Sequence, residues 1–308
     1  MKKEEHNHHK FDSIPDAHKA LGLPAPAHPL ISLVTAANVP EYPISSMGSH
    51  VLGFYKISYR PQLSGKVKYG QDYYDFNEGG LLFAAPNQVI GGTVPNQEDE
   101  PCARYTLLIH PDFLWNYPLG KKIKQYGFFA YSANEALHLS TTEKATVIAI
   151  FEMMEAELNS RIDDFSQDVI VSQIELLLNH ANRFYKRQFI TRKAVSNDLL
   201  QQLDELLETY FNTDASLLKG LPSVQYLASQ LHLTPSYLSD MLRALIGQNA
   251  QQYIHEKLIE KAKEILSTTT LSVSEVAYAL GFEHSQSFSK LFKTKTQLSP
   301  LEFRRSFN

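Results

Sequence analysis

Short polar and basic side chains recur at helical spacing near the C-terminus of this 308-residue chain. They lie in two segments, SVQYLASQLHLTPSYLSDMLR at 223–243 and SVSEVAYALGFEHSQSFSKLFK at 272–293. Gln can form paired hydrogen bonds with adenine and Lys can bond guanine, while Ser can donate to or accept from a base edge. These residue types therefore indicate base reading in the DNA major groove. The candidates are Ser236, Ser239, Asp240, Arg243, Ser285, Gln286, Ser289, Lys290 and Lys293.

The two segments repeat one helix-turn-helix pattern, with matching apolar positions at an offset of 49 residues before the turn and 50 after it. Gly281 suits a left-handed turn, whereas His232 at the matching position would adopt that conformation at a cost. Thr234 followed by Pro235 is a good start for the second helix of the first copy. The matched pairs are Val224/Val273, Leu227/Val276, Ala228/Ala277, Leu231/Leu280, Leu233/Phe282, Leu238/Phe288, Met241/Leu291 and Leu242/Phe292.

A single hairpin of this kind would fit a helical protein-interaction domain as well as it fits a DNA reader. Two copies in register, joined by one helix, favour DNA binding. The joining segment 248–266 would extend about 28 Å as a continuous helix. This length is close to the ~34 Å repeat that separates successive major-groove faces.

Charge is distributed unevenly over the repeat. Residues 198–283 contain five Lys or Arg against eleven Asp or Glu, whereas residues 284–308 contain five against one. We therefore expect the second copy, with Arg304 and Arg305 in the tail, to contribute most of the phosphate contacts. Phosphate would repel Asp240, so an ion pair within the protein is the expected role of that carboxylate.

The first half of the chain has a different pattern. Residues 50–110 contain short aromatic and β-branched runs separated by Gly, Pro and Asn, which predicts an antiparallel sandwich or barrel. A dense group of tyrosines with one arginine would suit a partly polar ligand. The same residues are also common as plain packing in a barrel. The candidate effector-binding residues are Tyr55, Tyr59, Arg60, Tyr69, Tyr73 and Tyr74.

Two amphipathic helices follow the predicted strands. A capping box of Ser140 and Glu143 begins the first helix, and Asp164 with Gln167 is placed to begin the second. Their apolar faces would cover the sheet or pair with another subunit. The apolar stripe of the second helix is Ile170, Ile174, Leu177, Leu178, Ala181 and Phe184.

The C-terminal hundred residues resemble the AraC/XylS family of bacterial transcription regulators. The resemblance lies in both hairpins, in EKLIEKAKEIL of the joining helix and in the closing SPLEFRRS. It implies a regulator, expected to be an activator, whose partners are double-stranded DNA, a small-molecule effector, RNA polymerase and a second copy of the chain. It also implies a cupin-like sensor domain. The sequence departs from the family pattern at Lys257, Ser287 and Gln297, where Arg, an aromatic residue and Gly are usual.

The sequence gives less support to an enzyme. Metal-using cupins carry an HxH pair, but none occurs between residues 50 and 140, where His50, His110 and His138 stand alone. We expect no metal and no cofactor, and a cupin-type metalloenzyme with a helical interaction tail is the alternative. The single cysteine, Cys102, excludes an intrachain disulfide. No apolar run approaches the ~20 residues that a bilayer requires, so the expectation is a cytoplasmic protein without membrane contact.

The predicted fold class is α+β: a cupin-like β-barrel with amphipathic helices, followed by an all-α domain of two helix-turn-helix units and a linker helix. The expected boundaries are an N-terminal arm at 1–30, a sensor domain at 31–140, a helical packing or dimerisation segment at 141–190, a linker at 191–197 and a DNA-binding domain at 198–308.

Overall fold

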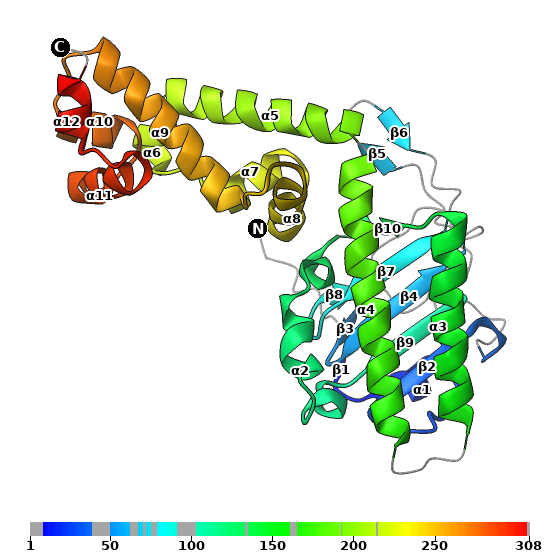
Figure 1. The fold of residues 1–308 in the computed structure, drawn as a ribbon. Helices are drawn as coiled ribbons and strands as arrows, with labels where there is room; N and C mark the ends of the chain where they lie inside the picture. The colour runs from blue at the N-terminus through cyan, green and yellow to red at the C-terminus, as the bar shows by residue number, and fades with distance from the viewer. Residues whose placement is uncertain are drawn as a thin grey trace, which may run out of the picture. The chain divides into compact units, whose positions relative to one another are not determined.

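The structure is a computed structural model that describes residues 9–38, 50–61, 67–69, 72–74, 79–90, 103–132, 135–160, 165–191, 193–213 and 215–306. It divides into two compact units, Met1–Gln188 and Phe189–Asn308. The first unit contains all the described strands and the second is helical (Figure 1). This division into a sheet-rich half and a helical half confirms the α+β class.

A five-stranded antiparallel sheet is the framework of the first unit, with the strand order β10-β7-β4-β9-β2. The central strand β4 pairs Ile57 with Phe83 on one side and with Leu107 on the other. Because side chains alternate along a strand, residues paired in this way lie on one face of the sheet. The strands are β2 (Ile31–Thr35), β4 (Tyr55–Arg60), β7 (Gly80–Ala84), β9 (Tyr105–Ile109) and β10 (Leu137–His138).

A smaller layer, formed by a three-stranded sheet and one helix, packs against this sheet. β1 (His9–Phe11) pairs in parallel with β3 (His50–Leu52), which pairs antiparallel with β8 (Val89–Ile90). Helix α1 (Ile14–Ala20) follows β1 and is capped by Ser13. Leu108 of the main sheet is buried in one apolar cluster with side chains from this layer, which therefore covers one face of β9. The other members of the cluster are Phe11, Ile14, Ala17, Leu52 and Phe54. A separate hairpin joins β5 (Val67–Tyr69) to β6 (Asp72–Tyr74).

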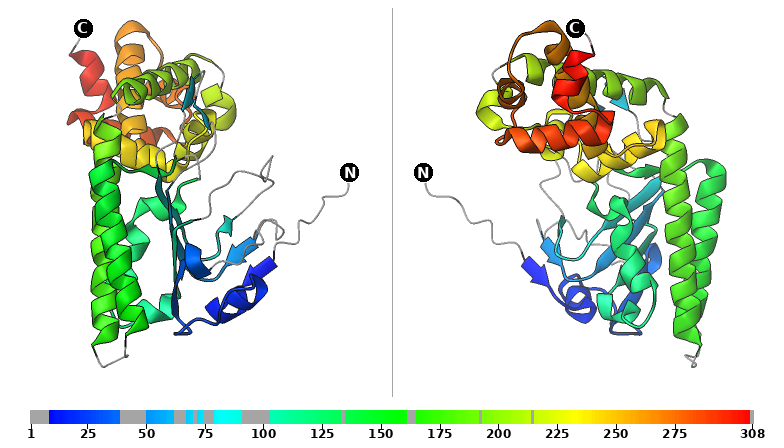
Figure 2. Two further views of the ribbon diagram at one scale, coloured as in Figure 1. Left: turned by 90° about the vertical axis from the view of Figure 1, so that its right-hand side faces the viewer. Right: turned by 60° about the vertical axis from the view of Figure 1, so that its left-hand side comes forward.

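Two long helices cover the opposite face of the main sheet (Figure 2). They are α3 (Thr141–Asn159) and α4 (Ser166–Thr191). The Tyr105 ring of β9 stacks on Phe151 of α3, with centroids 5.1 Å apart. The predicted capping box of Ser140 and Glu143 is present, and the predicted stripe of α4 is buried. Asp164, the predicted cap of α4, lies outside the described residues.

Several short elements connect the strands to these helices. They are η1 (Ala36–Asn38), η3 (Pro111–Leu114), α2 (Leu119–Lys122), η4 (Ile123–Gln125) and η5 (Gly127–Ala130). The stretch expected as a linker at 191–197 is mainly helical where it is described, because α4 ends at Thr191 and α5 begins at Lys193.

The second unit contains two helical hairpins that are joined by one long helix and pack against it. The first hairpin is α7 (Val224–Gln230) with α8 (Pro235–Ile246), and the second is α10 (Val273–Ala279) with α11 (Ser285–Thr296). Helix α9 (Ala250–Thr268) joins them and confirms the predicted connecting helix. The remaining helices are α5 (Lys193–Asn212), α6 (Ala215–Lys219) and α12 (Pro300–Arg305).

The two hairpin turns have the predicted backbone conformation. Gly281 has a φ of +91° and His232 a φ of +56°. Two matched positions of the repeat are buried in both copies. Ala228 and Ala277 are fully buried, and so are Leu238 and Phe288. A fully buried aromatic-rich cluster around Phe288 and Phe292 forms the core of the second hairpin against α9.

Candidate nucleic-acid interface

Helix α11 has one buried and one exposed face. Phe288 and Phe292 are fully buried, whereas Gln286, Lys290 and Lys293 are exposed and recur at spacings of four and three residues. Side chains three and four residues apart share one side of a helix. The buried phenylalanines therefore fix which side of α11 faces solvent, and that side carries an amide and two ammonium groups.

The remaining α11 candidates lie near this exposed face. Ser285 and Ser289 are half-buried. His284 is the N-cap of α11, but its side chain forms no capping hydrogen bond. The His284 ring is exposed at the start of the helix.

Helix α8 of the first hairpin offers less free charge. Thr234 caps it by accepting from Tyr237 N at 3.2 Å, and Ser236 and Ser239 are half-buried. Asp240 Oδ1 lies 2.6 Å from Arg243 Nη1, which confirms the expected ion pair within the protein. The positive charge of Arg243 is therefore neutralised locally.

Tyr237, next to the candidate Ser236, and Arg304, which was expected to contact phosphate, both form contacts within the protein. Tyr237 is buried and packs edge-on against Phe189, with ring centroids 5.1 Å apart. Arg304 is half-buried and donates from Nε to Leu266 O at 3.2 Å, which ties α12 to the end of α9. Arg305 is exposed. Of the two tail arginines, only Arg305 presents its side chain openly to solvent.

Helix α9 is held against α5 by a polar group that the sequence did not reveal. The Tyr253 hydroxyl donates to Asp204 Oδ1, and Lys257 Nζ lies 3.1 Å from the same carboxylate oxygen. Burial raises the pKa of the Tyr253 hydroxyl most, and the hydrogen bond to Asp204 raises it further. Lys257, at the position where the family usually has Arg, thus anchors the helix that joins the two hairpins.

The residues predicted to bind an effector do not all lie on one face of the sheet. Tyr55 and Tyr59 are buried on the face of β4 toward the helices, and the Tyr55 ring centroid lies 5.1 Å from that of Phe129. Burial raises the pKa of both hydroxyls. Arg60 follows Tyr59 in the strand and lies on the other face. The side chains of Tyr69, Tyr73 and Tyr74 lie outside the described residues.

The opposite face of β4 carries polar residues that sequence reasoning overlooked. Lys56 and Ser58 alternate with the buried tyrosines, and Ser58 Oγ lies 3.1 Å from Thr106 Oγ1 of β9. The signal was available in YKISYR, because a Lys, Ser and Arg at every second position define one polar face of a strand. Tyr55 and Tyr59, the predicted effector-binding tyrosines of this strand, lie on the other face.

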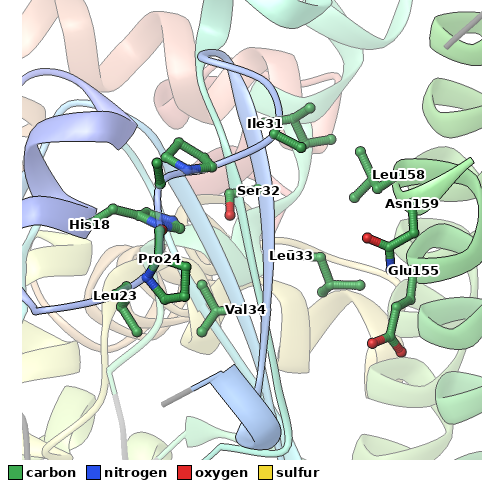
Figure 3. A pocket seen from close by; sticks show the side chains of 13 residues that line it. His18, Leu23, Pro24, Ile31, Ser32, Leu33, Val34, Glu155, Leu158 and Asn159 are labelled. Atoms are coloured by element: carbon green, nitrogen blue, oxygen red, sulfur yellow. The ribbon is translucent and has the colours of Figure 1, made fainter. Parts of the chain in front are cut away.

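A separate cavity of about 160 Å³ lies at the edge strand β2. His18 and Ser32 line it on one side of the strand, and Leu33 and Glu155 lie on the other (Figure 3). His18 Nδ1 is 2.6 Å from Pro24 O, while its buried Nε2 has no hydrogen-bond partner within the described part of the chain. This volume is below the roughly 300 Å³ of the smallest ordinary ligand sites.

Among the residues that the structure describes, no group of three or more His, Cys, Asp or Glu side chains is placed to hold a metal ion. No helix within those residues is both long and apolar enough to cross a bilayer.

Comparison with known proteins identifies both units. Residues 227–306 match the model of a helix-turn-helix domain, and residues 39–174 match the model of an AraC-like ligand binding domain. The chain is 24% identical over 251 residues to the HTH-type transcriptional activator RhaS of Escherichia coli O6:H1, covering 78% of this chain and 83% of that protein. It is 35% identical over 81 residues to the HTH-type regulator YijO of Escherichia coli K12, covering 26% and 29% of the two chains.

A solved structure is also similar to part of this chain. It is the C-terminal domain of the two-component response regulator yesN from Fusobacterium nucleatum, which is 33% identical, covers 32% of this chain and 95% of that one, and aligns with a TM-score of 0.28.

Proposed function

Since the chain belongs to the AraC family of transcription regulators, we propose that α8 and α11 are its two DNA-reading helices. The chain is a DNA-binding regulator with an N-terminal ligand-binding domain, and the alternative of a metalloenzyme has no support among its relatives. The proposal concerns which residues contact DNA. On α11 they are Gln286, Lys290 and Lys293 with the flanking Ser285 and Ser289; on α8 they are Ser236, Ser239 and Arg243, while the candidate Asp240 acts through its ion pair with Arg243.

The observation that carries this proposal is the division of α11 into a fully buried aromatic face and an exposed face with Gln286 and Lys290. A recognition helix needs its core side fixed so that its other side enters the groove in one orientation. Gln286 near the helix start is placed to read a base edge, and the two lysines are placed for guanine or phosphate. Asp240 is assigned to orienting Arg243, because the two groups form an ion pair.

The test begins by selecting preferred duplexes from a randomised pool with the full chain. Binding of the selected duplex is then measured for Gln286→Ala, Lys290→Ala and Lys124→Ala, the last being an exposed lysine of the first unit. Gln286→Ala should weaken binding about tenfold to a hundredfold and relax preference at one base pair. Unchanged affinity and preference in both α11 variants, or equal loss in Lys124→Ala, would overturn the contact assignment.

The proposal includes a homodimer and contact with RNA polymerase. The first rests on α4, where the exposed apolar side chains of Val169 and Leu176 lie seven residues apart on one side of the helix. Sedimentation of the wild type and of Leu176→Glu tests it: a dimer that becomes a monomer supports the assignment, and a wild-type monomer contradicts it. Action as an activator through RNA polymerase is proposed from the RhaS relatives, which are named as activators, and in vitro transcription tests it.

The residue boundaries of the parts also remain a proposal. They are an arm at 1–30, the ligand-binding part at 31–140, a helical segment at 141–190, a connection at 191–197 and the DNA-binding part at 198–308. Limited proteolysis followed by mass spectrometry would locate the accessible connections and test these limits.

A further inference from the structure

The cavity at the edge strand β2 contains one polar group whose hydrogen bonding is incomplete. His18 of α1 lines this cavity and is only 4% exposed. Its buried Nε2 forms no hydrogen bond with any residue that the structure describes. Buried polar atoms normally have partners, because the loss of hydration without a hydrogen bond costs free energy. The cavity therefore offers a ligand one position that the protein itself does not satisfy.

The segment after α1 fixes the orientation of the His18 ring. The chain reverses at Gly22, whose φ of +66° is a conformation that favours glycine. Leu23 N then donates to His18 O at 2.9 Å, and Pro24 O lies 2.6 Å from His18 Nδ1. These two bonds attach the loop to the backbone and to the ring of the same residue. In Figure 3 the ring extends from α1 toward β2.

The contact with Pro24 also determines what the second ring nitrogen can do. A carbonyl oxygen only accepts hydrogen bonds, so His18 Nδ1 carries the hydrogen of this bond. In a neutral imidazole the other nitrogen then has a lone pair and no hydrogen. His18 Nε2 is therefore an acceptor, and the partner that it lacks is a donor such as a hydroxyl group.

The surroundings of His18 in the cavity are uncharged. Pro24 and Val34 lie on the same side of β2 as the ring, together with the hydroxyl of Ser32, which is 7% exposed. The carboxylate of Glu155 lies on the other side of the strand (Figure 3). A charged group beside His18 would lose its hydration without gaining an opposite charge there. This part of the cavity thus suits an uncharged ligand with an apolar body.

The volume of the cavity limits the size of such a ligand. The cavity measures about 160 Å³, and an apolar protein cavity of about 150 Å³ can hold one benzene molecule. A compound of about six or seven non-hydrogen atoms would therefore fill it.

We propose that this cavity binds a small uncharged molecule that has an apolar body and a hydroxyl group, and that the hydroxyl group donates to His18 Nε2. Ser32, in the same wall, can donate to or accept from the oxygen of that group. The site differs from the predicted effector tyrosines Tyr55 and Tyr59, because these lie on β4 and β9 separates β4 from β2. The inference goes beyond the proposed function and does not depend on which residues contact DNA.

The test compares three ring compounds of nearly equal size in thermal unfolding of the full chain. Cyclohexanol donates and accepts hydrogen bonds, cyclohexanone only accepts them, and cyclohexylammonium chloride supplies a cation. A compound of this size should bind with a Kd on the order of 1 mM. At about tenfold excess over that value, cyclohexanol should raise the unfolding midpoint by about 2 °C or more. Cyclohexanone should bind about tenfold more weakly, because it leaves Nε2 without a donor.

A pair of histidine variants locates the response. His18→Leu should abolish the stabilisation by cyclohexanol, because it removes the acceptor and retains an apolar side chain. His110→Leu is the matched control and should respond like the wild type, since His110 is a half-buried histidine of the same unit whose Nδ1 accepts from Asp112 N. Circular dichroism of both variants checks that they fold.

NMR of the histidine ring nitrogens gives a second measurement, which needs only the wild type. His18 Nδ1 should carry the hydrogen with and without cyclohexanol, and the Nε2 resonance should move upfield when the hydroxyl group donates to it. An Nε2 resonance that does not move, or an equal thermal response in a folded His18→Leu variant, would overturn the proposal. Stabilisation by cyclohexanone or cyclohexylammonium as large as that by cyclohexanol would also overturn it.

Discussion

The two hairpins of the helical unit have one architecture but different side chains at several matching positions. At the turn, the first copy has His232 and the second has Gly281, both with positive φ. After the second helix the order is reversed, with Gly247 in the first copy and Gln297 in the second, again both left-handed. Each copy thus has one glycine and one residue with a Cβ at these two turns. The fold requires a left-handed backbone conformation at both turns. Each copy adopts it without a steric cost at its glycine and with a steric cost at the residue that has a Cβ.

The two copies also differ in the charged side chains of their second helices. In the first hairpin Arg243 is paired with Asp240, whereas in α11 Lys290 and Lys293 are exposed, and no ion pair within the described residues involves either of them. The apolar pattern is shared because both copies must pack against α9. The outer faces have no such constraint, so they can differ in what they bind. Four predictions test this comparison, from the largest expected effect to the smallest.

The largest loss of stability should come from the core. Phe288→Ala should lower the free energy of unfolding by about 3 to 5 kcal/mol, because it opens a cavity in a fully buried cluster. The Phe288 ring lies 5.4 Å from Phe282 and 5.7 Å from Phe292. Leu238→Ala at the matching position should cost about 2 to 5 kcal/mol. Urea unfolding measures both values, and a clearly smaller cost for Phe288→Ala would show that the second core is the looser one.

The turn position comes next. Gly281→Ala should destabilise by more than about 2 kcal/mol, because the new methyl group would clash with backbone and φ is unfavourable. A Cβ there would lie 2.6 Å from Gly220 C and O. His232→Gly should change stability by less than about 1 kcal/mol, since relief of the left-handed conformation opposes the added chain entropy. Thermal unfolding of both variants checks this, and similar costs would contradict the proposed difference between the turns.

The salt dependence of DNA binding should distinguish the two recognition helices. Lys290→Ala should reduce the slope of log K against log salt by about 1 if the ammonium contacts phosphate. Arg243→Ala should reduce it less, because Asp240 already neutralises the guanidinium. Asp240→Asn is the matched control and should increase affinity by removing a negative charge near the phosphates. Titrations at several salt concentrations measure the slopes, and equal slopes in the two alanine variants would refute the asymmetry.

The smallest effect concerns the helix caps and pH. Helix α10 begins with a capping box of Ser272 and Glu275, whereas in α7 the matching position after Ser223 is Tyr226, which cannot form one. The hydrogen bonds from Ser272 hold the pKa of Glu275 below its usual 4.5. Because the folded-state pKa is lowered, the stabilisation is present above the unfolded pKa and is lost as pH falls through the folded value.

NMR titration of the Glu275 carboxyl group should therefore give a pKa below 4.5. Glu275→Gln should remove this pH dependence from the second hairpin and leave the first unaffected. Glu302, whose pKa is lowered by Ser299 in the capping box of α12, is the internal control and should keep its lowered value in that variant. A Glu275 pKa at or above the usual value would contradict the cap as the cause.

Some features follow from local sequence alone. The start of α3 at Ser140 and Glu143, the positive φ of Gly281 and His232, and the burial of Leu238 and Phe288 were all predictable. Each depends on residues close together in the chain, through capping, backbone sterics or helical periodicity. The Asp240–Arg243 pair was predictable for the same reason, since the two residues lie three apart on one helix.

Contacts between distant segments were decided only by the tertiary structure. The anchoring of Tyr253 and Lys257 by Asp204 joins residues about fifty positions apart, and Tyr237 is buried by Phe189. The same holds for β4. Its alternation showed two faces, but the strand order and the burial of Leu108 beneath the N-terminal layer decided that Tyr55 and Tyr59 lie on the side of the helices and that Lys56 lies on the side of the N-terminal layer. Alternation is a local property, whereas the choice of which face is covered by which layer depends on long-range packing.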